Sequence, residues 1–99
     1  MKKIAFEEHY ATPELMALRK ELLSYLGVEM NLPAKELQRT THLACDIEEE
    51  RLPSMDRNEI DMEVLMCASN GLEGVTDSAR AVSIARDFND CVAQVTRKY

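Results

Sequence analysis

The chain has 99 residues, of which 45% are apolar and 30% are charged, a composition typical of a small globular domain and not of a disordered segment. Its 18 acidic and 12 basic side chains give a formal net charge of -6, and the basic residues form no stripe, which argues against nucleic-acid binding. No apolar run approaches the ~20 residues that a membrane-spanning helix requires, and no signal peptide is predicted, so we expect a cytoplasmic protein without membrane contacts.

The three cysteines are too far apart for a CxxC metal or redox motif. Widely spaced thiols in odd number are typical of a reducing compartment, so we predict that they are free. Cys67 and Cys91 lie in apolar segments and are predicted to be core residues.

The first predicted element is a strand that begins at Lys3 and ends at His9, with an apolar start and a polar end. Side chains alternate between the two faces of a strand. We therefore expect Ile4 and Glu8 on one face, and Glu7 and His9 together on the other.

A helix is predicted next, because Thr12 can cap a helix, Pro13 suits the first helical position, and Gly27 suits the residue after the end. Its apolar face repeats at three- and four-residue spacing and consists of Leu15, Leu18, Leu22 and Leu26. Residues 28–40 have weaker periodicity and are predicted as a loop with a short helical turn.

Residues 41–58 are predicted to be helical with an interruption, after which a short helix runs from Pro53 to Asn58. A second strand is predicted at residues 62–68, and its nearly continuous apolar character is typical of a strand buried on both faces. A last helix is predicted at residues 78–98. Its apolar stripe consists of Ala81, Ile84, Ala85, Phe88, Cys91, Val92 and Val95.

This order of elements begins an α/β fold with parallel strands. Two strands cannot close a barrel, and a complete eight-stranded α/β barrel needs roughly 250 residues. We therefore predict one partial domain over residues 1–99, the strand-helix-strand-helix portion at the start of such a barrel.

Glu7 and His9 are the candidate metal ligands, because a carboxylate and an imidazole both bind divalent cations well. They end a strand, and α/β barrels place their active sites at the C-terminal ends of strands. A Glu-x-His pair also occurs by chance at solvated strand ends, so spacing alone leaves both interpretations open. Asn70, just beyond the second strand, is a candidate for substrate contact.

Three other polar features have simpler interpretations. Glu8 is expected to make a supporting hydrogen bond or ion pair, and His42 is expected to be exposed near a helix start. The acidic residues at 46 and 48–50 are most simply a solvated helical face.

A longer pattern resembles a known family. It consists of the opening from Lys3 to Glu14, Asp46, Arg51-Leu52, Met55-Asp56, Ile60, Ala85-Arg86 and Asn89-Asp90. In this order the residues resemble the N-terminal portion of amidohydrolase-related decarboxylases, the family of γ-resorcylate and 2,3-dihydroxybenzoate decarboxylases. The resemblance is weakest at residues 16–45. Pro53 is unusual for the family, and Glu59 replaces a common glycine, which implies a different turn.

The resemblance implies a (β/α)8 TIM-like barrel with one divalent cation, zinc or manganese, and Glu7 and His9 as the first two ligands. The remaining ligands and the catalytic acid-base residues of the family come from later strands. Implied substrates are aromatic, hydroxybenzoate-like acids or small unsaturated carboxylic acids. In the aromatic acids the ring carbon is protonated, and carbon dioxide then leaves. The chain alone is then expected to show no significant turnover.

Two alternatives remain at this point. Related family members are metal-dependent hydrolases, and their first strand can carry the same two ligands. A non-catalytic α/β module would instead present its second strand and last helix to a partner. The expected associations are a homo-oligomer or a complex with the missing C-terminal part.

Overall fold

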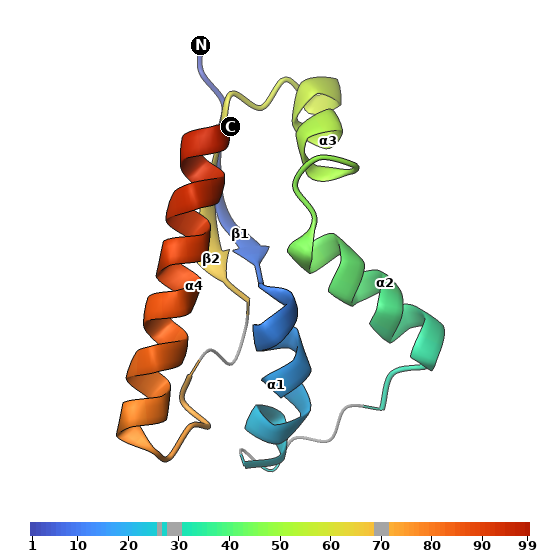
Figure 1. The fold of residues 1–99 in the computed structure, drawn as a ribbon. Helices are drawn as coiled ribbons and strands as arrows, with labels where there is room; N and C mark the ends of the chain where they lie inside the picture. Colours follow the sequence, from blue (N-terminus) through green and yellow to red (C-terminus); the bar gives the residue numbers. More distant parts are fainter. Residues whose placement is uncertain (26, 28–30, 69–71) are drawn as a thin grey trace. The chain divides into compact units, whose positions relative to one another are not determined.

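A computed structural model of the chain describes residues 1–25, 27, 31–68 and 72–99 (Figure 1). The elements in chain order are β1 (Ile4–Tyr10), α1 (Pro13–Tyr25), α2 (Ala34–Cys45), α3 (Arg51–Asn58), β2 (Met62–Cys67) and α4 (Ser78–Lys98). The predicted α/β order is confirmed. One compact unit contains β1, α2, α3 and β2, and a second contains α1 and α4. The single partial domain over residues 1–99 stays a prediction.

The strands β1 and β2 form a parallel pair in the first unit (Figure 1). Ile4 pairs with Met62 at the start, but the register shifts between Ala5 and Glu8. Two residues of β1, Phe6 and Glu7, thus lie opposite a single residue of β2, Val64. This arrangement is a β-bulge. Parallel strands were predicted and are confirmed, whereas the bulge was not predicted.

The bulge corrects the predicted faces of β1. After it, Glu8 pairs with Leu65 and His9 pairs with Met66. One extra residue reverses the alternation. The prediction placed Glu8 on the face of Ile4, but in the structure His9 lies on that face and Glu8 lies on the other. Glu8 and His9 still lie on opposite faces.

The face of β2 that carries Met62, Val64 and Met66 is open, with exposed fractions of 52%, 37% and 46%. The predicted burial of this strand on both faces is therefore wrong for this chain, because the described elements of its unit leave that face uncovered. Cys67 is also exposed, so its predicted core position is wrong, whereas Cys91 is half-buried. All three cysteines carry reduced thiols, as predicted.

The loop predicted at residues 28–40 is wrong for its second half, because α2 begins at Ala34. Pro33 precedes it with φ -54°, and its carbonyl accepts the first helical hydrogen bond, from the Leu37 N–H. The predicted interruption lies earlier than expected, between α2 and α3. Pro53 falls in the first turn of α3, where a missing N–H costs no helical hydrogen bond.

Glu59 ends α3 in the left-handed conformation, with φ 55° and ψ 42°. Its N–H and that of Ile60 close the helix onto the Asp56 and Met55 carbonyls, so the chain makes the turn that a glycine would make. The expectation of a different turn at this position is therefore wrong. Lys3 joins this turn to the start of β1, since its carbonyl accepts from the Asp61 N–H at 3.0 Å.

In the second unit, the predicted Thr12 cap, the start of α1 at Pro13 and the limits of α4 are confirmed, whereas the Asp77 cap of α4 was not predicted. The Thr12 hydroxyl accepts from the Leu15 N–H at 3.2 Å, and Asp77 accepts from the Arg80 N–H at 2.8 Å at the start of α4. Arg80 donates two hydrogen bonds to the Glu21 carboxylate, at 2.7 and 3.2 Å, and this contact holds the pKa of Glu21 below its usual value. The apolar stripe of α4 is half-buried throughout. Among the described residues, no helix has the length and apolar character needed to cross a membrane.

Candidate metal centre

Glu7 and His9 both have exposed side chains in the second half of β1. Glu7 lies in the bulge with φ 58°, a backbone conformation that residues other than glycine rarely adopt. Exposed carboxylate and imidazole groups are suitable donors for zinc or manganese. The donor chemistry of β1 therefore fits a divalent cation.

Two ligands make an incomplete site. Within the described ranges, the only His, Cys, Asp or Glu side chains that offer three ligand atoms within 4.8 Å of one another are His42, Asp46 and Glu49. Glu7 and His9 have no such third ligand among the described residues. A full coordination shell at β1 thus needs ligands from outside this set.

The group of His42, Asp46 and Glu49 is explained by capping. The Asp46 carboxylate accepts the N–H groups of Glu49, Glu50 and Arg51, at 3.1, 2.8 and 3.0 Å. These bonds close the turn between α2 and α3. The prediction that Asp46 belongs to a solvated helical face is therefore wrong. His42 is exposed, as predicted, but it lies in the last turn of α2 and not near a helix start, and its Nε2 is 3.6 Å from the Glu49 carboxylate.

Asp46→Asn is expected to lower the free energy of unfolding near pH 7 by about 1 kcal/mol, since the charged acceptor is lost. Burial acts to raise the pKa of Asp46, but the backbone hydrogen bonds from Arg51, Glu50 and Glu49 outweigh it and hold the pKa below its usual value. The charged form therefore stabilises the fold above the unfolded pKa of about 3.9. This stabilisation disappears as the pH falls through the folded pKa.

Urea unfolding of wild type and Asp46→Asn at neutral and acidic pH checks this prediction. The difference between the two should shrink toward acid. Asp87→Asn, a change at an exposed carboxylate of α4, serves as the control and should have little effect. An Asp46→Asn effect of the same size at both pH values would contradict the assignment.

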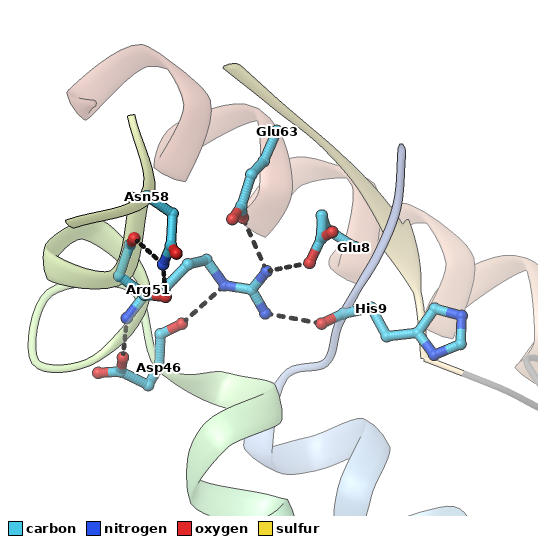
Figure 2. Close-up of polar contacts among 7 residues, drawn as sticks. Glu8, His9, Asp46, Arg51, Asn58 and Glu63 are labelled. Carbon is cyan, nitrogen blue, oxygen red and sulfur yellow. Dashed lines mark hydrogen bonds and ion pairs between the residues drawn. The ribbon is translucent and has the colours of Figure 1, made fainter. Parts of the chain in front are cut away.

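Arg51 connects both strands to the turn between α2 and α3, as Figure 2 shows. Its Nη1 lies 2.9 Å from a Glu63 carboxylate oxygen, and its Nη2 lies 2.7 Å from the His9 carbonyl oxygen. Its Nε donates to the Asp46 carbonyl at 3.3 Å. The side chains of Arg51 and Glu63 are only 13% and 10% exposed, so this ion pair is largely shielded from water.

The opposite faces of β1 are visible at Glu8 and His9. Figure 2 shows Glu8 directed toward Arg51, and the imidazole of His9 directed away from it. The Glu8 carboxylate lies 3.9 Å from Nη1 of Arg51, which confirms the predicted supporting ion pair. The sequence did not mark Arg51 as a site residue. Its only signal was its place in the Arg51-Leu52 pair of the family pattern.

The candidate substrate contact, Asn70, lies outside the described residues. Tyr10, which follows His9, is 5% exposed and belongs to the core.

Comparison with known proteins relates the chain to enzymes that remove a carboxyl group from hydroxybenzoates. No protein-family model matches the chain. It is 33% identical over 96 residues to the γ-resorcylate decarboxylase of Rhizobium sp. (strain MTP-10005), covering 97% of this chain and 27% of that protein. It is 34% identical over 92 residues to the enzyme of the same name from Rhizobium radiobacter, covering 93% of this chain and 25% of that protein.

A solved structure agrees with these relatives. The crystal structure of 2,6-dihydroxybenzoate decarboxylase complexed with 2,6-dihydroxybenzoate matches 99% of this chain and 28% of that chain, with a TM-score of 0.77 and 30% identity. The resemblance to γ-resorcylate decarboxylases predicted from the sequence is thereby confirmed, over the N-terminal part only. The chain spans about a quarter of the length of the relatives that it matches.

Proposed function

We propose that this chain forms the first two strands and associated helices of a (β/α)8 TIM-like barrel in a metal-dependent decarboxylase of aromatic, hydroxybenzoate-like acids. The observation that carries the proposal is the match of nearly the whole chain to a 2,6-dihydroxybenzoate decarboxylase, at a TM-score of 0.77. The relatives named γ-resorcylate decarboxylase support the same substrate class.

In this proposal Glu7 and His9 hold the divalent cation, zinc or manganese, with ligands supplied from beyond the described residues. The bound cation supplies a positive charge that can hold a substrate carboxylate. Both side chains are exposed and lie near the C-terminal end of β1, where barrel sites form. Glu8 is paired with Arg51 on the other face and is not a ligand.

The open face of the sheet supports a barrel. His9 pairs with Met66 and thus shares a face with Met62 and Val64, whose side chains are exposed. In a barrel, alternate residues of each strand point inward and are covered by those of the other strands. A barrel interior on this face would bury the exposed apolar side chains and would place His9 beside the substrate.

A hybrid enzyme tests the proposal. This chain would replace the matching N-terminal part of the decarboxylase from Rhizobium sp., and carbon dioxide release from 2,6-dihydroxybenzoate would be measured. We expect turnover that falls at least about 10-fold in Glu7→Gln and His9→Gln, together with a loss of bound metal. His42→Gln, a histidine change away from β1, should keep both.

Circular dichroism and metal content first establish that the hybrid is folded and loaded. A folded, metal-loaded hybrid that releases no carbon dioxide from hydroxybenzoates would contradict the decarboxylase. Ester or ring opening in its place would indicate the hydrolase. Activity that survives both ligand variants would remove Glu7 and His9 from the metal centre.

A further inference from the structure

We propose that Arg51 is a positioning residue of the metal centre, which anchors the β1 backbone at His9 and holds Glu8 on the face opposite the imidazole. This inference rests on the proposed function, because it assigns Arg51 a role toward the two proposed ligands. Arg51 itself would not touch the cation, since its guanidinium contacts the carbonyl of His9 while the imidazole points the other way (Figure 2).

The need for an anchor arises from the bulge. Between Ala5 and Glu8 the regular pairing with β2 is interrupted, and it resumes at Glu8, directly before His9. At 2.7 Å, the hydrogen bond from Nη2 of Arg51 to the His9 carbonyl is shorter than the bonds of this guanidinium to Glu63, at 2.9 Å, and to Asp46, at 3.3 Å. It acts directly at a proposed ligand, and it therefore limits how far the His9 backbone can rotate.

Arg51 also distinguishes between the two neighbouring carboxylates of β1, because it pairs with only one of them, Glu8. Glu7 and Glu8 are adjacent, and either could approach a cation if it were free to turn. The guanidinium attracts Glu8 at 3.9 Å and Glu63 at 2.9 Å, both from the face opposite the His9 imidazole. Glu8 is thus occupied as a counter-ion, which leaves Glu7 as the carboxylate available on β1.

The guanidinium shape matters for this role. Its Nε, Nη1 and Nη2 atoms bind three acceptors, which belong to Asp46, Glu63 and His9. The backbone of Arg51 is itself fixed, because its N–H donates to the Asp46 carboxylate at 3.0 Å. A lysine at this position carries the same charge as a single compact ammonium and cannot reproduce the planar fork. Arg51→Lys thus separates positioning from charge.

The test uses the 99-residue chain, with two readouts by nuclear magnetic resonance. The first, measured without metal, is the carbonyl carbon signal of His9, which reports the bond from Arg51. The second is line broadening of the His9 ring and Glu7 side chain by added Mn²⁺, which detects weak binding residue by residue. In Arg51→Lys we expect the carbonyl signal to move and the Mn²⁺ affinity at His9 to fall by about 10-fold.

Glu63→Gln is the matched control, because it removes the ion pair and keeps the donor to His9. Its Mn²⁺ affinity should equal that of wild type. If Arg51→Lys does not fold, the paired variant Arg51→Met/Glu63→Gln takes its place, since it leaves no unpaired carboxylate at Glu63. It should show the same loss.

Two results would overturn the inference: an unchanged His9 carbonyl signal in the Arg51 variant, or wild-type Mn²⁺ affinity in that variant. A different result addresses the proposed function. If Mn²⁺ broadens neither His9 nor Glu7 in wild type, the ligand assignment fails, and with it any role of Arg51 toward a metal. The carbonyl signal then still decides whether Arg51 anchors His9.

Discussion

Arg51→Met is expected to lower the free energy of unfolding by about 3 kcal/mol, the largest stability change that we predict for a single substitution. The Glu63 side chain is 10% exposed and depends on Arg51 for its charge balance. Without the guanidinium, that carboxylate stays shielded from water with no cation, and Glu8 adds a second negative charge nearby. The His9 and Asp46 carbonyls also lose a donor.

Urea unfolding followed by circular dichroism measures this loss, with Lys3→Met as the matched control. Lys3 pairs with Glu59 at 3.4 Å, but both side chains are largely exposed, at 57% and 85%. The control should therefore change stability by less than about 1 kcal/mol. Arg51→Met/Glu63→Gln should recover part of the loss, because the unpaired charge is gone. Equal effects of Arg51→Met and Lys3→Met would contradict the shielded ion pair.

The elements that the sequence predicted well are those with local signals. The last helix was predicted at residues 78–98 and is found there, because its apolar spacing is a signal carried within one helix. Met62–Cys67 was recognised as a strand from its apolar run. Thr12 acts as the predicted cap, through a bond to a residue only three positions away.

The errors arise where contacts across the chain decide the backbone. A period of two residues predicts a regular β1 and cannot detect the extra residue between Ala5 and Glu8, which depends on pairing with β2. The start of α2 was missed because residues 34–40 are mostly exposed and hold few apolar side chains. Glu59 adopts a conformation that usually indicates glycine, so its identity was misleading.

The same distinction holds for the candidate site. Glu7, His9 and the supporting role of Glu8 could be proposed from neighbouring positions on one strand. Arg51 could not, since its importance depends on acceptors that lie 42 residues before it, at His9, and 12 residues after it, at Glu63. Its contact with Glu8 follows from the same fold.

Glu7→Gly is expected to stabilise the fold and to abolish metal binding at β1. Glu7 has φ 58°, and a left-handed conformation costs an L side chain about 1 kcal/mol relative to glycine. The substitution relieves this cost, so the free energy of unfolding should rise by about 0.5–1 kcal/mol. It also removes the carboxylate, so Mn²⁺ should no longer broaden the His9 ring measurably.

Glu59→Gly is the control that separates backbone strain from ligand chemistry. Glu59 has nearly the same conformation, with φ 55°, but it ends α3, and its side chain forms an ion pair with the exposed Lys3. Both variants should gain stability by urea unfolding, and only Glu7→Gly should lose Mn²⁺ binding. Backbone strain at a position that glycine would fill more easily is typical of functional sites. If Glu7→Gly kept Mn²⁺ at His9, the strain in β1 would have no explanation in metal binding.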